Sequence, residues 1–121
     1  MAANLLGRWG ESLAAEYLRK KGYELLHANY RCRMGEIDLI AQKKKVIVFV
    51  EVKLRKNADF AQAMEFVDLR KQRRIKIAAE LFLSEQDLMD SKTRFDVIEV
   101  YAPDGAATIK PEIRHLEDAF Q

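Results

Sequence analysis

The sequence predicts an α/β domain that spans residues 1–121, in the order helix, three strands, helix, strand. Apolar residues recur at helical spacing over residues 8–21. Two short runs rich in Ile, Val and Phe occupy residues 36–41 and 46–54, and residues 94–101 alternate as a half-buried strand does. No internal repeat or linker divides the chain, whose 121 residues are in the usual range for one domain. We therefore expect a single mixed unit.

The first helix carries a C-terminal signal. Arg19, Lys20 and Lys21 stand directly before Gly22. Cations are favourable in the last turn of a helix, and glycine is common just past its end. The mixed stretch that follows, residues 24–31, predicts a first strand.

The second half of the chain predicts a long helix and several shorter elements. We expect the helix over about residues 62–84, with a basic first half and an apolar second half. A Pro-Asp-Gly turn at residues 103–105 follows the strand over 94–101. Residues 107–110 are expected to form a short edge strand, and the C-terminal residues a last helical turn.

Composition limits the classes of function. The net charge of +2 is mildly basic and does not by itself indicate a nucleic-acid partner. Cys32 is the only cysteine, which excludes a disulfide framework and a cysteine zinc site and favours a reducing cytosol. The longest apolar run, residues 46–52, is interrupted by Glu51 and is too short to cross a bilayer, and the N-terminal residues lack a signal-peptide pattern. We expect a cytoplasmic protein with no membrane partner.

The two central strands predict a hairpin with two unlike faces. If the connection is centred between positions 43 and 44, Glu36 opposes Glu51, and Asp38 is a diagonal neighbour of Glu51. A shift by one residue would mix polar and apolar groups on both faces, so the pattern favours this register. The apolar face consists of Ile37, Leu39, Ala41, Val46, Val48, Val50 and Val52. The other face carries Ile40, Ile47 and Phe49 near the turn and Glu36, Asp38, Glu51 and Lys53 toward the open end.

Acids gathered on one face of a buried strand pair indicate a cation site. Like charges repel, and burial makes each charge costly. Diagonal positions place the Cβ atoms of Asp38 and Glu51 roughly 6–8 Å apart, which suits two carboxylates that reach one ion. Mg²⁺ binds carboxylate oxygens and lowers the pKa of a water that can attack a phosphodiester, and Lys53 could orient that water. The alternative is a solvated face with an ordinary Glu–Lys pair, and the strand pattern alone leaves both open.

Several short motifs are spread over nearly the whole chain. The central ones are Gly35-Glu36-Ile37-Asp38-Leu39-Ile40-Ala41 and Val48-Phe49-Val50-Glu51-Val52-Lys53-Leu54-Arg55. The others are Gly7-Arg8-Trp9-Gly10-Glu11 with Ala14, Tyr17 and Leu18, then Gly22-Tyr23, Lys71, Arg94-Phe95-Asp96-Val97 and His115-Leu116-Glu117-Asp118-Ala119-Phe120. Together these motifs resemble the YraN-like family of bacterial proteins, which is related to archaeal Holliday-junction resolvases within the PD-(D/E)xK nuclease superfamily. The resemblance implies a restriction-endonuclease-like, resolvase-type three-layer fold with a mixed sheet.

The resemblance also implies roles for individual residues. Asp38 and Glu51 would be the metal ligands, Lys53 the catalytic lysine and Glu11 a further catalytic acid from the first helix. Glu11 lies on the core-facing stripe of that helix, where an acid needs a partner; the alternative is an acid in the first turn that the helix dipole favours. Glu36 is a candidate to tune the site from outside the ligand set.

Two positions depart from the family pattern. Ile37 stands where the superfamily has proline before the aspartate, which costs little because the aspartate supplies the chemistry. Ala61 follows Phe60 where relatives often have glycine, so the loop beyond Arg55 is expected to differ in shape.

Cations near the acids are candidate phosphate contacts, because a nuclease must offset the repulsion between its carboxylates and the nucleic-acid backbone. The alternative is that these charges form solvated faces. The candidates are Arg55, Arg70, Lys71 and Arg74, with residues 43–45, Arg31 and Arg33 as further ones. By contrast, we expect Asp96 to be structural and to pair with a nearby arginine, and His27 and His115 to be isolated from any metal-ligand set.

The leading hypothesis is therefore a nuclease that uses Mg²⁺ or Mn²⁺ to hydrolyse phosphodiester bonds in DNA, including branched or damaged DNA. The alternatives are a non-catalytic nucleic-acid-binding module and a subunit of a DNA repair or recombination complex. Because resolvase relatives act as homodimers, a homodimer is compatible with the resemblance. The sequence leaves the choice between DNA and RNA, and between endo- and exonuclease, open.

Overall fold

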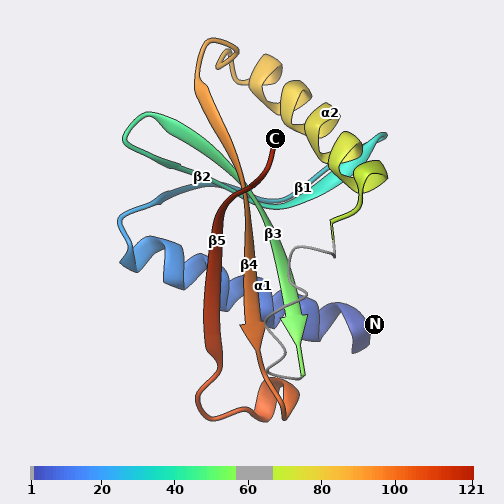
Figure 1. Ribbon diagram of the computed structural model, residues 1–121, viewed down its shortest axis with the longest axis vertical. Coiled ribbons are helices and arrows are strands. Elements are labelled where there is room, and N and C mark those ends of the chain that lie inside the picture. The colour runs from blue at the N-terminus through green and yellow to red at the C-terminus, as the bar shows by residue number, and fades with distance from the viewer. Residues whose placement is uncertain (1, 57–66) are drawn as a thin grey trace.

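The computed structural model describes residues 2–56 and 67–121 of the chain (Figure 1). Its elements are α1 (Ala2–Lys20), β1 (Glu24–Cys32), β2 (Gly35–Lys43), β3 (Val46–Arg55), α2 (Leu69–Glu85), β4 (Lys92–Tyr101), the 3-10 turn η2 (Gly105–Ala107) and β5 (Glu112–Phe120). The predicted order of helix, three strands, helix and strand is confirmed, and β5 is added at the end. None of the helices in the described part of the chain is long and apolar enough to span a membrane.

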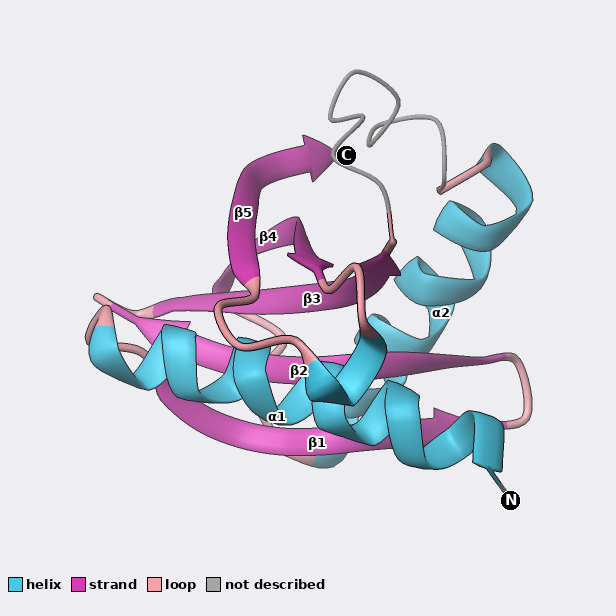
Figure 2. Ribbon diagram, turned by 90° about the horizontal axis from the view of Figure 1, so that it is seen from below, coloured by secondary structure: helices cyan, strands magenta, loops and turns pink. Residues whose placement is uncertain are grey.

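The strands form one mixed sheet in the order β1-β2-β3-β4-β5. Only the β3–β4 pair is parallel among the described strands, and α2 lies in the crossover between them. The two helices cover opposite faces of the sheet, so that α1 and α2 are the outer layers (Figures 1 and 2). The chain is thus α/β with a mixed sheet, as predicted.

Each helix buries its own set of strand residues. Ala14 and Leu18 of α1 are fully buried, and Ile75 and Phe82 of α2 nearly so. The cluster under α1 includes Leu39, Ala41, Val48, Val50, Ile98 and Val100. The cluster under α2 includes Tyr30, Ile37, Ile40, Ile47, Phe49 and Val97. Side chains alternate along β3 between these two clusters, which is the expected pattern for a strand buried on both faces.

The β2–β3 hairpin has a tighter turn than predicted. Lys44 and Lys45 both have positive φ angles, 51° and 67°, and Lys43 pairs with Val46. Positive φ at both central residues is the signature of a two-residue hairpin turn whose twist matches the flanking strands. Each paired residue of β2 therefore lies opposite a residue of β3 that is two positions further along the chain than predicted. A two-residue displacement keeps each side chain on its face, but the predicted opposition of Glu36 and Glu51 is wrong.

The pairing of β2 with β3 ends where the acids begin. Leu39 pairs with Val50 as the last regular partner, and beyond it the Val52 N–H donates to Asp38 Oδ2 at 2.8 Å. Figure 1 shows the β1–β2 hairpin turning away from the direction of β3 and β4. Ile37 packs in the cluster under α2, so its predicted place on the face of Leu39 is wrong. Strand alternation is therefore interrupted between Ile37 and Leu39, where the Asp38 side chain accepts the hydrogen bond from Val52 N–H.

The C-terminal elements also differ from the prediction. The expected edge strand over residues 107–110 is absent from the described structure, because η2 ends at Ala107 and residues 109–110 form a bend. The expected last helical turn is instead the nine-residue strand β5. Pairing with the buried strand β4 decides this, since strand formation depends more on neighbours than on local preference.

The second helix begins later than expected. Asp68 is its N-cap, and its side chain accepts a hydrogen bond from the Lys71 N–H. Residues 62–66 of the predicted helix, and the predicted change of loop shape near Ala61, lie outside the described residues.

Candidate functional site

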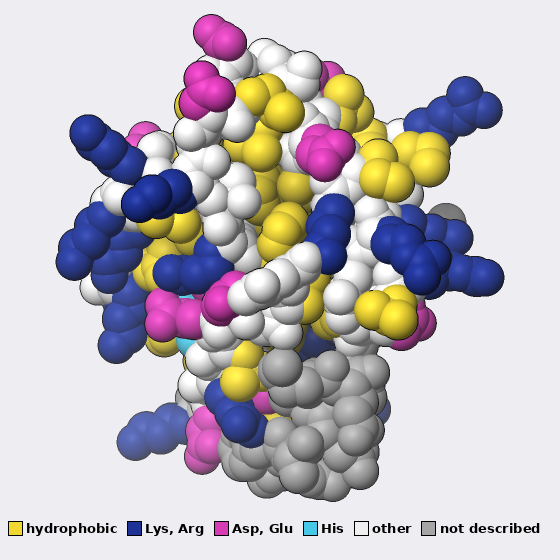
Figure 3. Space-filling model, turned by 45° about the horizontal axis from the view of Figure 1, so that its top comes forward, with side chains coloured by type: hydrophobic (Ala, Val, Ile, Leu, Met, Phe, Trp, Pro, Cys, Tyr) yellow, Lys and Arg dark blue, Asp and Glu magenta, His cyan; other side chains and the backbone are white. Residues whose placement is uncertain are grey.

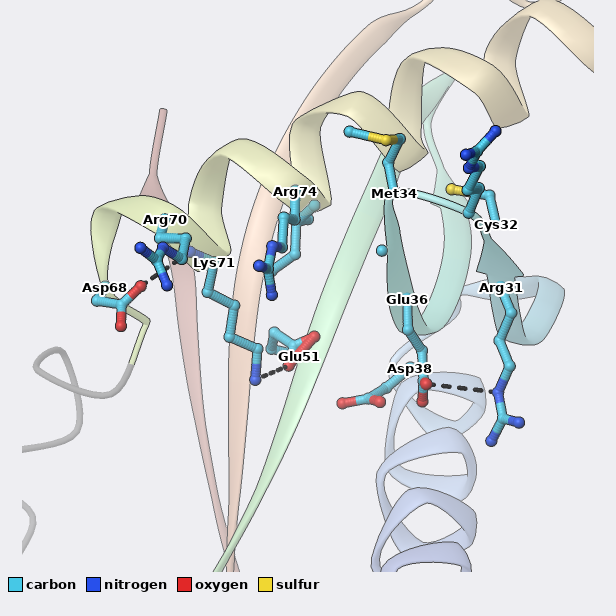
Figure 4. A pocket seen from close by; sticks show the side chains of 13 residues that line it. Arg31, Cys32, Met34, Glu36, Asp38, Glu51, Asp68, Arg70, Lys71 and Arg74 are labelled. Carbon is cyan, nitrogen blue, oxygen red and sulfur yellow. Dashed lines mark hydrogen bonds and ion pairs between the residues drawn. The ribbon is translucent and has the colours of Figure 1, made fainter.

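An open cleft of about 940 Å³ lies between the β1–β2 turn, β3 and the first half of α2 (Figure 4). Its charged lining comprises the cations Arg31, Arg33, Arg70, Lys71 and Arg74 and the acids Glu36, Asp38, Glu51 and Asp68. Lys and Arg side chains also project from both sides of the face drawn in Figure 3. The cleft therefore combines acids with cations that come from both α2 and the β1–β2 hairpin.

Gly35 sets one wall of the cleft. A Cβ atom at this position would lie 2.9 Å from the backbone carbonyl oxygen of Arg74. Contacts this short are essentially never made by real Cβ atoms, so only glycine lets the start of β2 pass this close to α2. The close approach holds the β1–β2 turn beside the helix that carries the cleft cations.

Asp38 lies in the gap between β2 and β3. Burial raises the pKa of its carboxyl to about 7, with the charge of Glu51 as the next cause, and the hydrogen bond from Val52 N–H opposes the shift. The nearby charges of Glu11 and Glu36 act in the same direction as that of Glu51. The site therefore holds more negative charge than its own donors stabilise.

Glu11 approaches the same gap from the α1 side. It lines a smaller hollow with Asn29 and Leu39, whereas Glu51 lies in the cleft on the α2 side. Burial raises the pKa of the Glu11 carboxyl, and its Oε1 atom is buried with no hydrogen-bond partner. Asp38 interacts with both Glu11 and Glu51. The gap between the strands thus brings acids from opposite faces of the sheet to one place.

Glu51 is paired with a lysine from α2. Its side chain is 6% exposed, and Lys71 Nζ lies 2.9 Å from its Oε1 atom. Burial lowers the pKa of Lys71, but contacts with Lys53 and Glu51 outweigh it, and the net shift is upward. The sequence placed Lys71 among the phosphate contacts; its pairing with Glu51 was missed, because nothing in the spacing of α2 and β3 indicates it.

Lys53 lies beside these groups, one alternation beyond Glu51 on β3. Burial lowers its pKa to about 8, and hydrogen bonding to Lys71 adds to the shift. The structure therefore brings together all four residues predicted as catalytic: Glu11, Asp38, Glu51 and Lys53.

The remaining predicted residues divide into two groups. Arg70, Lys71 and Arg74 border the cleft, and so does Glu36, which forms an exposed ion pair with Arg31 at 3.4 Å. Arg55 does not line the cleft, and its Nε atom lies 3.4 Å from Oε2 of the fully buried Glu99. Its predicted role in nucleic-acid binding stays a prediction.

A second charged cluster lies on the α1 side of β4 and β5. Arg94 donates to both carboxylate oxygens of Asp96 at 2.8 Å, which confirms the predicted pairing of Asp96 with an arginine. His115 Nε2 lies 2.6 Å from Asp96 Oδ2, so the prediction that His115 is isolated is wrong. Only the pairing of β5 with β4 could have revealed this contact.

This second cluster has ligand types that suit a metal. Asp96, His115 and Glu117 each offer one atom, all within 4.8 Å of one another. However, Arg94 Nη2 already contacts both acids, at 2.8 Å from Asp96 and 3.2 Å from Glu117. The guanidinium supplies the positive charge that an ion would supply, so we interpret the cluster as structural.

The donor types of the first site suit a hard divalent cation, although among the described residues only the Asp96 cluster brings three such ligand atoms within 4.8 Å of one another. Glu11, Asp38 and Glu51 offer carboxylate oxygens, the donor type that Mg²⁺ and Mn²⁺ prefer. The unpartnered Oε1 atom of Glu11 and the lysine bound to Glu51 both indicate a need for positive charge.

Comparison with known proteins agrees with the extent of the sequence motifs. Residues 10–100 match the model of the family described as "Uncharacterised protein family UPF0102". A UPF0102 protein of Caldicellulosiruptor saccharolyticus is 48% identical over 96 residues, which cover 79% of this chain and 81% of that protein. One from Caldanaerobacter subterraneus is 43% identical over 95% of this chain and 93% of its own length, and one from Rhodococcus opacus is 44% identical over 99% and 100%. The chain therefore belongs to the UPF0102 family, also called the YraN family.

Proposed function

We propose that this protein is a divalent-metal-dependent nuclease that hydrolyses phosphodiester bonds in DNA and has a resolvase-type, restriction-endonuclease-like fold. One observation carries the proposal: Asp38, in the gap between β2 and β3, interacts with Glu51 on one side and Glu11 on the other, next to Lys53. Structural carboxylates are normally paired within the protein. Here Glu51 is paired with Lys71, but burial and neighbouring acids raise the pKa values of Asp38 and Glu11, which is typical of a functional site.

The proposed roles follow from position. Asp38 and Glu51 would hold Mg²⁺ or Mn²⁺, with Glu11 as a further acid that orients the set. A bound ion would supply an activated water and positive charge near the scissile phosphate. Lys53 would donate hydrogen bonds to the charge that develops on the phosphate oxygens.

The surroundings of the acids support a nucleic-acid substrate. Five cations and four acids line the cleft, and the cations lie on both the β1–β2 turn and α2. A phosphate backbone that crosses the acids would therefore meet positive charge on either side, which offsets the repulsion by the carboxylates.

The test is cleavage of a panel of linear, nicked, flapped and four-way-junction DNA with Mg²⁺, Mn²⁺ or EDTA. Asp38→Asn is the control variant, because its amide oxygen can still accept the hydrogen bond from Val52 N–H while the charge is removed. We expect metal-dependent cutting by the native protein and none above background by the variant. Equal cutting by both proteins would identify a contaminating nuclease. Binding without cutting would favour the non-catalytic module.

A further inference from the structure

We propose that Lys71 couples nucleic-acid binding to metal binding: its ammonium neutralises Glu51 in the free protein and moves to a phosphate of bound nucleic acid, which frees Glu51 to ligate the cation. Lys71 is then a positioning residue that sets the order of assembly. This inference rests on the proposed function, whose failure the experiment below distinguishes.

The first step of the argument is that one ligand atom is already occupied. Glu51 Oε1 lies 2.9 Å from Lys71 Nζ, and the Glu51 side chain is almost entirely buried. A buried carboxylate that loses its partner is strongly destabilising, so the free protein holds this contact. A divalent ion placed beside the ammonium would be repelled by it. The free protein is therefore expected to bind the ion weakly.

The second step is that the lysine head can leave while its backbone stays in place. The Lys71 side chain is 41% exposed, in contrast to its partner. Its backbone N–H donates to Asp68 Oδ1 at 2.8 Å, as part of the N-cap of α2. The long, flexible stem of lysine lets the ammonium change partners without moving the helix. Figure 4 shows this side chain extending from α2 across the cleft to Glu51.

The third step is that the alternative partner is a phosphate. Arg70 and Arg74 of the same helix line the same cleft, as do Arg33 and Arg31 of the β1–β2 hairpin, although Arg31 is paired with Glu36. A phosphate held between these arginines would lie within the space into which the exposed part of Lys71 can turn. The Lys71 ammonium would then bind the phosphate instead of Glu51. Glu51 would bind the divalent ion instead of the ammonium.

This exchange has a thermodynamic consequence. If nucleic acid increases the affinity for the ion, the ion must increase the affinity for nucleic acid by the same factor. Arg74 provides a matched comparison, because it lines the same cleft from the same helix but forms no ion pair with an acid among the described residues. Removing Arg74 reduces the positive charge of the cleft equally, without releasing Glu51.

The experiment measures Mn²⁺ binding by the loss of the free-ion electron paramagnetic resonance signal. Native protein, Lys71→Met, Arg74→Met and Asp38→Asn are each titrated alone and with a phosphorothioate four-way-junction DNA that resists hydrolysis. A titration of the DNA alone corrects for its own Mn²⁺. Lys71→Gln, which can still donate a hydrogen bond to Glu51, is the second variant in case Lys71→Met folds poorly.

We expect Lys71→Met or Lys71→Gln to bind Mn²⁺ about tenfold more tightly than the native protein without DNA, a typical size for coupling between two sites. DNA should raise the affinity of the native protein and of Arg74→Met, but change that of the Lys71 variants little. Without DNA, equal Mn²⁺ affinity of the native protein and the Lys71 variants, or an equally large increase in affinity caused by Arg74→Met, would overturn the coupling while leaving the metal site intact. Mn²⁺ binding that is absent, or unchanged in Asp38→Asn, would overturn the metal site and the coupling together.

Discussion

Two aspartates of the sheet, the half-buried Asp38 and the fully buried Asp96, have opposite environments. Asp38, between β2 and β3, has a pKa raised to about 7, with burial as the main cause and the charge of Glu51 next. Asp96, on β4, has a lowered pKa: burial alone would raise it, but hydrogen bonds from His115, Arg94 and the Asp118 N–H outweigh burial. The same residue type is thus stabilised by its partners in one place and left short of positive charge in the other.

The difference lies in where the partners come from. Around Asp96 the protein supplies them all: Arg94 binds both oxygens, His115 lies at 2.6 Å and the Asp118 N–H at 3.0 Å. Around Asp38 the neighbours are mainly other acids, and the hydrogen bond from Val52 N–H opposes their effect. The first arrangement is suited to stability. The second arrangement is less stable without an external cation. Such a local loss of stability is common at functional sites.

The largest effect is expected from breaking the satisfied cluster. Arg94→Met would leave Asp96 buried without its main partner and should lower the free energy of unfolding by about 3–5 kcal/mol. Urea denaturation in EDTA measures this. Arg31→Met is the matched control, because it removes an exposed ion pair with Glu36 and should cost less than about 1 kcal/mol. Equal, small losses in both variants would contradict the structural interpretation of the cluster.

A smaller effect is expected from pH. A carboxyl with a lowered folded-state pKa contributes stability above its unfolded pKa of about 3.9 and loses it as the pH falls through the folded-state pKa. The native protein should therefore exceed Asp96→Asn in stability by a constant amount above about pH 5. The gap should close as the pH falls below about 4. Denaturant titrations from about pH 5 to well below pH 4 measure this change, and a gap that does not change over that range would show that Asp96 is not the group responsible.

The smallest effect should have the opposite sign. Asp38→Asn removes a charge that its neighbours disfavour and keeps the acceptor for Val52 N–H, so in EDTA it should raise the stability by about 1 kcal/mol. Adding Mg²⁺ should raise the melting temperature of the native protein but not of the variant. The same Asp-to-Asn change would thus stabilise one site and destabilise the other. If Asp38→Asn and Asp96→Asn were both less stable than the native protein in EDTA, the two sites would not differ in the way described.

Local patterns were sufficient for much of the fold and for the central acids. Alternation in β2 and β3 depends on neighbours along one strand, and it placed Asp38, Glu51 and Lys53 correctly at the open end of the hairpin even though the register differed by two positions. The helical stripe of α1 likewise placed Glu11 toward the sheet. These features could be predicted because a two-residue displacement of the register does not by itself move a side chain to the other face.

Contacts between distant segments could not be predicted in this way. The ion pair of Lys71 with Glu51 depends on how α2 crosses β3, and the contact of His115 with Asp96 depends on β5 being a strand. Ile37 lies on the other face from its predicted one, next to the point where Asp38 accepts the hydrogen bond from Val52 N–H. The sequence by itself determined which acids and lysine lie at the hairpin's open end. Tertiary structure alone decided which charges neutralise one another, because charge pairing depends on distances in space rather than on spacing along the chain.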